Sequence, residues 1–259
     1  MQQKVASAES DTLSSSPTTV FIVEPHTCQT IPLLHTLLAK RMSNSVAAVD
    51  LLMKVQLLQY FDLAGLVESI AEVSESIYQF PQVDSLRDQT TPKTINAHQD
   101  PEHVVLIEGL ASTLSATQRR SGLVQANALL ASLTRSIAQL SKLARRPLVL
   151  ISIPIDVRTR RENGQTETTY LQRAGQGLQL ESAFSGQDGE SYTLACGSML
   201  LSQTLAESLD RLVHVHDAFG RAPSRRRHPN LPAQCVTEVM KDRVGNLAGL
   251  WAVWQGHST

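Results

Sequence analysis

Hydrophobic residues recur along this chain in two patterns, as short continuous runs and as longer stretches with helical spacing. The short runs are found at Thr19–Val23, Val46–Leu52, Val104–Ile107 and Leu148–Ile153. Leu63–Ile77 and the stretch from 123 to 140 instead place apolar residues every three or four positions. A continuous apolar run is typical of a strand buried on both faces, whereas the second spacing is typical of an amphipathic helix. The pattern therefore predicts an α/β fold, with a central, mainly parallel sheet flanked by helices.

The stretch His103–Pro154 contains the clearest unit of this kind. An apolar run ends at Glu108 and Gly109, a long amphipathic segment follows, and a second apolar run ends at Pro154. This order predicts a parallel strand–helix–strand unit. A carboxylate at the carboxyl end of a strand lies where open α/β sheets bind ligands. Glu108 is therefore a candidate site residue, although a carboxylate here can also cap the turn that follows, and we favour that interpretation.

The remaining pattern predicts one domain from 19 to 255 behind a disordered polar tail at 1–18. The segments 81–100 and 157–193 are polar and rich in turn-forming residues, which favours loops or insertions. Leu205–His216 reads as a helix end that leads into a strand. Two further apolar runs, Cys235–Met240 and Leu250–Trp254, flank a polar turn and predict a C-terminal β-hairpin.

The loop after the first strand does not carry phosphate-binding chemistry. Nucleotide-binding α/β domains place GxxxxGK[ST] here, because the glycines let backbone amides surround the phosphates and the lysine reaches the terminal ones. Residues 24–30 read EPHTCQT, with no glycine and no lysine. Thr30 alone supplies the hydroxyl, and Glu24 would repel phosphate. Thr30, Asp50 and Glu108 are therefore predicted as positions of a degenerate nucleotide site.

Charge is unevenly divided along the chain. Residues 1–118 carry 13 acidic and 6 basic side chains, a net of −7, and residues 119–259 carry 11 acidic and 17 basic ones, a net of +6. Such polarity favours a second half that meets an anion, or a partner that covers one half; chance segregation of solvated surface charges is the alternative.

Two basic loops are the candidates for contact with nucleic acid. Clustered arginines neutralise phosphates without reading sequence. The first loop contains Arg158, Arg160, Arg161 and Arg173, and the second contains Arg225, Arg226 and Arg227. Solvated loop charges with no ligand are the alternative interpretation.

Other kinds of site find little support. Cys28, Cys196 and Cys235 are widely spaced and odd in number, which favours free thiols in a reducing compartment over a zinc site or a disulfide framework. His214 and His216 alternate along a predicted strand, and we expect them to face opposite sides and not to share a metal. No metal and no cofactor is expected, nor is a membrane span or a signal peptide.

In its order of elements, the chain resembles the RecA-like core of the eukaryotic recombinase paralogues, a P-loop-type fold. The resemblance rests on His103–Leu110 with the helix and strand that follow, on Leu205–His216 with its basic turn, and on CVTEVMKDRVGNLAGLWAVW. Lys241, Asp242 and Arg243 form its most telling local match. Two departures stand out: the phosphate loop is missing at 24–30, and the acid of the Walker B strand is Glu108 where aspartate is usual.

The resemblance implies a degenerate member that keeps the fold without ATPase activity, similar to Shu-complex subunits. It implies a nuclear subunit that supports homologous recombination repair beside another RecA-like paralogue subunit, in a heterodimer or larger complex, and that contacts single-stranded DNA. Two alternatives remain open. One is a structural RecA-like subunit of a tRNA-modifying Elongator-type assembly, and the other is a weak ATPase completed by a partner subunit.

Overall fold

The computed structural model describes eight stretches of the chain, residues 19–42, 44–79, 103–143, 147–159, 177–182, 190–194, 196–217 and 234–255. Within them, the largest sheet has four parallel strands in the order β2-β1-β3-β4. These strands are β1 (Thr19–Pro25), β2 (Val55–Tyr60), β3 (His103–Ile107) and β4 (Leu148–Ile151). The α/β class with a parallel sheet flanked by helices is thereby confirmed.

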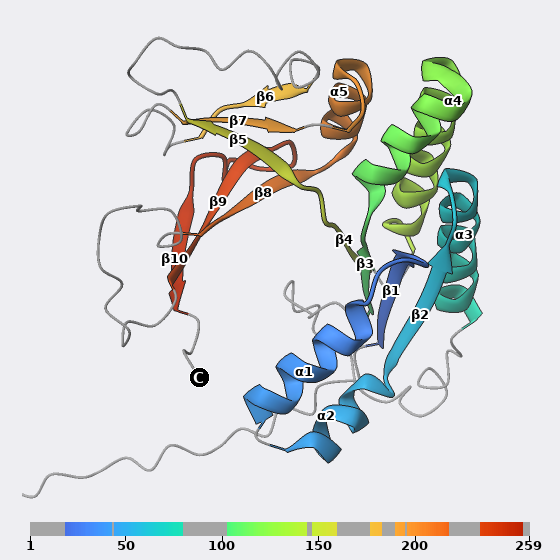
Figure 1. Ribbon diagram of the computed structural model, residues 1–259, viewed down its shortest axis with the longest axis vertical. Helices are drawn as coiled ribbons and strands as arrows, with labels where there is room; N and C mark the ends of the chain where they lie inside the picture. The colour runs from blue at the N-terminus through green and yellow to red at the C-terminus, as the bar shows by residue number, and fades with distance from the viewer. Residues whose placement is uncertain are drawn as a thin grey trace, which may run out of the picture.

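Two helices cover one face of this sheet. They are α3 (Leu63–Gln79) and α4 (Leu110–Leu140), which pack on each other and lie on the same side of the strands in Figure 1. Alternate strand residues, among them Phe21, Val23, Val105 and Ile107, join the apolar stripes of both helices in one buried cluster. Each fully buried side chain of this size contributes about 1.5–3 kcal/mol. This cluster is the main core of the protein.

The connection from β1 to β2 runs on the other side of the sheet and consists of α1 (Thr30–Met42) and α2 (Ser45–Leu52) (Figure 1). Connections between parallel strands are right-handed, so the direction in which the chain moves along the sheet decides which face the connecting helices cover. The step from β1 to β2 runs in the direction opposite to the steps from β2 to β3 and from β3 to β4, and α1 and α2 therefore lie on the face opposite to α3 and α4. The predicted strand at Val46–Leu52 is wrong: these residues are helical. The side chain of Asn44 accepts hydrogen bonds from the amides of Val46 and Ala47 at 2.9 and 3.3 Å and so caps a helix there.

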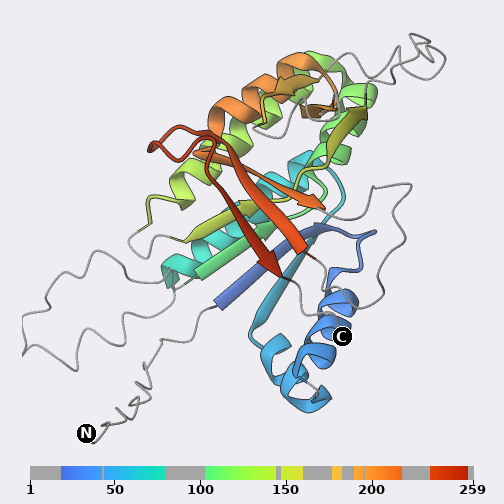
Figure 2. The ribbon, with the colours of Figure 1, turned by 90° about the vertical axis from the view of Figure 1, so that its left-hand side faces the viewer.

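Two smaller antiparallel sheets complete the described structure. One has the order β5-β7-β6, built from β5 (Ile155–Thr159), β6 (Leu178–Leu180) and β7 (Glu190–Leu194), where the sequence had predicted loops. The other has the order β10-β9-β8, built from β8 (Arg211–Asp217), β9 (Gln234–Asp242) and β10 (Trp251–Gln255), and contains the predicted C-terminal hairpin. In Figure 2, β9 and β10 lie in front of the central sheet, as seen from its helix-poor side.

The last helix, α5 (Met199–Ser208), leads into β8 and packs against α4. The hydroxyl of Ser198 accepts a hydrogen bond from the Leu201 amide at 3.3 Å and caps its first turn. The predicted helix end before a strand at Leu205–His216 is therefore confirmed. None of the helices in the described stretches is long and apolar enough to cross a membrane.

Two glycines with positive φ, Gly109 after β3 and Gly122 within α4, distinguish the cost of backbone conformation from the cost of packing. Gly109 has φ 73°, and a Cβ added there would lie 2.3 Å from Cγ of Pro25, whereas Gly122 has φ 84° and would meet nothing within 4 Å. Gly122→Ala should cost about 1–3 kcal/mol of unfolding free energy for its backbone conformation alone, because φ 84° with ψ 169° lies in a region that is essentially limited to glycine. Gly109→Ala should cost about 1–3 kcal/mol more, because the end of β1 must move. Urea unfolding of both variants measures the difference, and equal losses would contradict the close approach of Gly109 to Pro25.

Candidate functional site at the carboxyl edge of the central sheet

The order of the strands reverses at β1. The chain passes from β1 to β2 on one side and later returns to β3 on the other side of β1. In open α/β sheets, ligands bind beyond the carboxyl ends of the strands at such a switch point. Glu24 lies near the end of β1, and Glu108 directly follows β3, with the Glu108 amide donating to the Val23 carbonyl at 2.9 Å. Two carboxylates therefore stand at the switch point.

Glu24 is the residue of this site whose importance the sequence analysis missed. Its side chain is 1% exposed. Gln59 donates to Oε1 at 3.4 Å, while Oε2 is buried without a hydrogen-bond partner. A buried carboxylate oxygen with no donor is unfavourable, and it would be relieved by a cation or a donor. The available signal was the position of Glu24 at the end of an apolar run, the same position that singled out Glu108.

Glu108 is held through its backbone. The hydroxyl of Tyr60 donates to the Glu108 carbonyl at 2.6 Å, and Gly109 then turns the chain into α4. The carboxylate of Glu108 forms no hydrogen bond within the described stretches, so the capping role that the sequence favoured receives no contact. Burial, with smaller contributions from Cys28 and Glu108, raises the pKa of Tyr60 to about 12, against the opposing effect of its hydrogen bond with Thr113. Tyr60 is therefore a neutral donor at physiological pH.

Cys28 lies beside both carboxylates. Burial raises the pKa of its thiol, and the negative charges of Glu24 and then Glu108 raise it further. The thiol is therefore protonated at neutral pH. Because the thiolate is the reactive form of cysteine, Cys28 is not an activated nucleophile.

The loop between β1 and α1 uses its amides within the chain. The His26 amide donates to the Tyr60 carbonyl at 3.0 Å, and the Cys28 amide donates to the Pro25 carbonyl at 2.9 Å. A phosphate-binding loop instead directs its amides toward the ligand. The amides of His26 and Cys28 are instead bonded to carbonyls of the chain.

Of the three predicted positions of a degenerate nucleotide site, two follow the carboxyl ends of the neighbouring strands β1 and β3. Thr30 begins α1, directly after the loop that follows β1, and Glu108 follows β3. Asp50 lies elsewhere: it is an exposed residue of α2, the helix that leads into the amino end of β2. Its inclusion rested on the predicted strand at Val46–Leu52, and these residues are helical. Within the described stretches, no group of three or more histidine, cysteine or acidic residues is placed to hold a metal.

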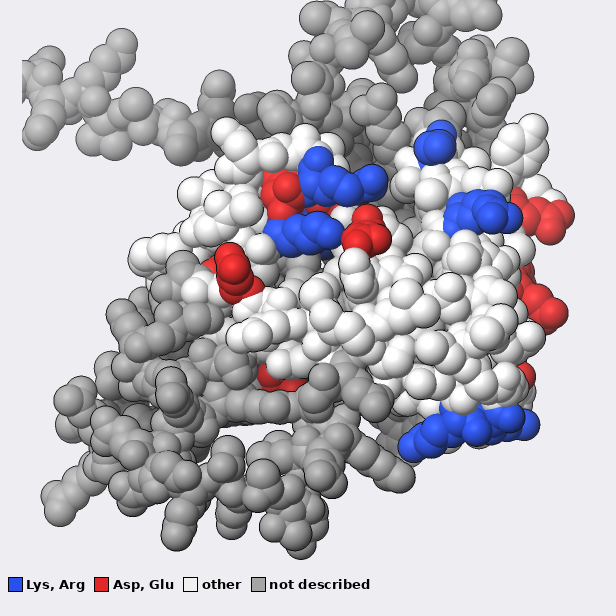
Figure 3. All heavy atoms as spheres, turned by 90° about the horizontal axis from the view of Figure 1, so that it is seen from above, with Lys and Arg blue, Asp and Glu red and all other residues white. Residues whose placement is uncertain are grey.

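The arginines predicted to contact DNA fall mostly outside the described residues. Arg158 belongs to β5, where it pairs with Ser191 of β7. Arg160, Arg161, Arg173, Arg225, Arg226 and Arg227 lie outside the described stretches. On the face shown in Figure 3, the basic side chains of the described residues are scattered, and several lie beside acidic ones.

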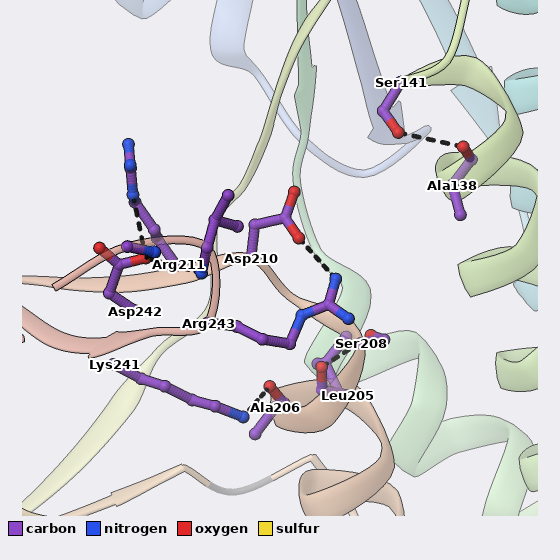
Figure 4. A network of polar contacts seen from close by, with 12 residues as sticks. Ala138, Ser141, Leu205, Ala206, Ser208, Asp210, Arg211, Lys241, Asp242 and Arg243 are labelled. Carbon is purple, nitrogen blue, oxygen red and sulfur yellow. Dashed lines mark hydrogen bonds and ion pairs between the residues drawn. The ribbon is translucent and has the colours of Figure 1, made fainter.

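Lys241, Asp242 and Arg243 form a network that ties β9 to the end of α5 (Figure 4). Lys241 Nζ donates to the Ala206 carbonyl near the end of α5 at 2.7 Å, which satisfies one of the free carbonyls of that helix. Arg243 pairs with the Asp210 carboxylate at 2.5 Å, and its amide donates to the Asp210 carbonyl at 2.8 Å. These contacts hold the β9–β10 hairpin against the end of α5 and the start of β8.

The Asp242 carboxylate organises the turn between β9 and β10. It accepts hydrogen bonds from the amides of Val244, Gly245 and Leu247 at 2.9–3.1 Å, and Arg211 Nε lies 3.4 Å away. Desolvation acts to raise the pKa of Asp242, but the three amides and Arg211 together outweigh it and hold the pKa below its usual value.

His214 and His216 lie side by side, which corrects the expectation that they face opposite sides. Their ring centroids are 4.0 Å apart, and both pack against the ring of Tyr192. Side chains alternate along a strand, so residues two positions apart share a face. His216 Nε2 lies 2.8 Å from Glu238 Oε2, which also accepts a 2.6 Å hydrogen bond from Ser182. This buried polar cluster joins the two smaller sheets.

No protein-family model matches the chain, and no curated protein matches its sequence. Among solved structures, the chain is similar to the crystal structure of the RadB recombinase. The two are 14% identical, the match covers 93% of this chain and 76% of that chain, and the TM-score is 0.47. A likeness of this degree carries no information about residues or function.

Asp242 gives a pH prediction. Because its pKa is lowered in the folded protein, its contribution to stability is fully present above the unfolded-state value near 3.9 and is lost as the pH falls through the lower folded-state value. Urea midpoints measured between pH 6 and pH 3 should therefore fall in the wild type. In Asp242→Asn the midpoint at pH 6 should be lower and the fall on acidification smaller. Glu207→Gln, on the exposed face of α5, is the control; an Asp242→Asn profile parallel to the wild type would contradict this role.

Proposed function

We propose that this protein is a non-catalytic RecA-like recombinase paralogue that supports homologous recombination repair in the nucleus through protein partners. The composition and hydrogen bonding of the loop at 24–30 are the observation that supports a non-catalytic role. It has neither glycine nor lysine, and the amides of His26 and Cys28 are occupied by carbonyls of the chain. Catalysis of phosphoryl transfer depends on positioning and charge stabilisation of the phosphates, and such a loop provides neither.

Exposed apolar surface supports a role through partners. The helix α1 contains no buried residue, and its Leu33 and Leu37 are 65% and 63% exposed. Val46 and Met53, in and just after α2, are 71% and 80% exposed. Clusters of exposed apolar side chains mark interaction surfaces in soluble proteins. A second RecA-like subunit is the partner that the sequence resemblance favours.

One observation favours an alternative in which a partner completes an ATPase site. Glu24 and Glu108 stand together at the switch point, and Glu24 Oε2 has no hydrogen-bond partner. Two carboxylates suit a magnesium ion bound to phosphates that another subunit would hold. No described feature favours the structural role in a tRNA-modifying assembly over the recombination role, and recovered partners would separate the two.

Nucleotide binding by the isolated chain provides a direct test. We expect no change in thermal stability with Mg-ATP, whereas a ligand at 100 times its Kd would add about 2.7 kcal/mol. A clear stabilisation that Glu24→Gln abolishes would contradict the non-catalytic assignment. Stabilisation only after addition of a purified partner, together with ATP hydrolysis that Glu24→Gln abolishes, would instead support the completed ATPase.

Direct DNA contact is tested by reversing the charge of the second basic loop. Arg225→Glu, Arg226→Glu and Arg227→Glu together should weaken binding to a fluorescent oligo-dT and lower the salt dependence of log K by roughly 0.7 for each lost phosphate contact. The control carries the same change in net charge at three exposed arginines, Arg41, Arg119 and Arg120. If both triple variants bind alike, the loop does not contact DNA.

Affinity purification of the tagged chain from its own cells separates the recombination role from the tRNA-modifying role. Recovery of a RecA-like recombinase paralogue is the expected result. Recovery of Elongator-type subunits alone would overturn the proposal.

A further inference from the structure

A row of polar residues crosses the central sheet at its carboxyl edge. In the parallel register, Glu24 of β1 lies beside Gln59 of β2. The amides of Glu108 and Ser152 continue the ladder beyond the ends of β3 and β4, and each donates to a carbonyl of the neighbouring strand at 2.9 Å. Each strand therefore contributes one residue to the polar row Gln59, Glu24, Glu108 and Ser152.

The polar row faces away from the main core. The residues next to it along the strands, among them Val23, Tyr60, Ile107 and Ile151, belong to the main buried cluster or pack against it. Because side chains alternate along a strand, the polar row points to the opposite face of the sheet. Neighbouring strands lie about 4.8 Å apart, so Glu24 and Glu108 place two carboxylates on adjacent strands.

Glu24 supplies the observation that points to a ligand. Its side chain is 1% exposed, Gln59 donates to Oε1 at 3.4 Å, and Oε2 has no hydrogen-bond partner. None of the ion pairs in the described stretches includes Glu24 or Glu108. Adjacent like charges repel each other, and a buried carboxylate oxygen without a donor is unfavourable. The missing partner is therefore a positively charged group.

The composition of the polar row favours an organic cation over a metal ion. Across the described stretches, no three histidine, cysteine or acidic residues are grouped to hold a metal. A guanidinium group instead carries five N–H donors in one plane and pairs with carboxylates through two parallel hydrogen bonds. It also stacks on aromatic rings, which an ammonium group does less well.

An exposed aromatic ring lies at the same edge of the sheet. His26 and Phe61 stand two positions beyond the polar row, after the ends of β1 and β2. Their ring centroids are 4.4 Å apart, and Phe61 is 80% exposed. An exposed ring near two carboxylates offers a cation both stacking and charge.

We propose that the polar row is a binding site for a guanidinium group, with Glu24 and Glu108 as its carboxylate partners and Phe61 as its stacking surface. Glu108 is half-buried and Glu24 is buried, so the cation reaches Glu24 past Glu108. The proposal rests on the proposed function in one respect, namely that this edge of the sheet binds no nucleotide. The guanidinium group belongs either to a free compound or to an arginine side chain of a polypeptide.

Binding of model compounds to the full chain tests the chemistry and separates the two sources. The probes are Nα-acetyl-argininamide, which represents arginine in a polypeptide, and free L-arginine. The control is Nα-acetyl-citrullinamide, which has the same shape without the charge. Isothermal titration calorimetry at constant ionic strength should show saturable binding of a guanidinium compound and none of the control. Tighter binding of the blocked probe assigns the site to a polypeptide, and tighter binding of L-arginine assigns it to a free compound.

Three results of the same titrations would overturn the proposal. The first is equal binding of the citrulline compound, because the charge would then not matter. The second is the absence of saturable binding by both guanidinium probes. The third is saturable binding of MgCl2 that prevents binding of the blocked probe, since the polar row would then be a metal site.

Carboxylate variants locate the site. Glu24→Gln and Glu108→Gln keep the side-chain shape and remove one charge each, and each should raise the Kd of the blocked probe about tenfold. The fold should tolerate Glu24→Gln, because it removes a buried charge that has no ion-pair partner. The matched control is Glu72→Gln, at an exposed glutamate of α3. Circular dichroism reports whether each variant is folded, and an unchanged Kd in both folded variants would overturn the proposal.

A pair of aromatic variants tests the stacking surface. Phe61→Ala should raise the Kd of the blocked probe roughly threefold, as expected for the loss of an exposed cation–π contact. The control is Tyr78→Ala at the end of α3, because Tyr78 is 81% exposed and Phe61 is 80% exposed. Equal Kd values for the two variants would contradict the role of Phe61.

The guanidinium site and the proposed function fail separately. If the blocked probe binds and Mg-ATP also stabilises the isolated chain, the non-catalytic assignment fails and the guanidinium site stands. If neither guanidinium compound binds while a RecA-like paralogue is recovered with the tagged chain, the guanidinium site fails and the proposed function stands.

Discussion

The parallel pairing of β1 with β2 and β3 is the constraint on which the rest of the structure depends. It brings the carboxyl ends of β1 and β3 together, and with them Glu24 and Glu108. It also fixes the helices, because right-handed crossovers in opposite directions place α1 and α2 on one side and α3 and α4 on the other. The buried cluster around Phe21, Val23 and Val105 follows from that arrangement.

The switch point at β1 and the outer edge of β4 differ in their packing. At the switch point, Gly109 approaches Pro25, Tyr60 donates to the Glu108 carbonyl, and the amides of His26 and Cys28 donate to carbonyls of the chain. Within the described stretches, no strand pairs with the outer edge of β4, which lies beside half-exposed leucines and valines.

Lys241, Asp242 and Arg243 gave the strongest local sequence resemblance to the recombinase paralogues, and in the structure their side chains have structural roles. Lys241 satisfies a carbonyl near the end of α5, Asp242 gathers the amides of the β9–β10 turn, and Arg243 returns to Asp210. All three side chains therefore serve to hold the hairpin against the preceding helix.

The sequence by itself determined the α/β class, the strands β1, β3 and β4, the helix α3 and the C-terminal hairpin, because apolar periodicity reports burial directly. It could not decide whether Val46–Leu52 is a strand or a helix, because a short apolar run is compatible with both. The cap formed by Asn44 favours the helix. Only the tertiary structure brought Glu24 to Glu108 and Cys28, set His214 beside His216, and placed Gln59 and Ser152 on either side of the two carboxylates. These relations depend on which strands pair, and pairing joins residues far apart in the chain.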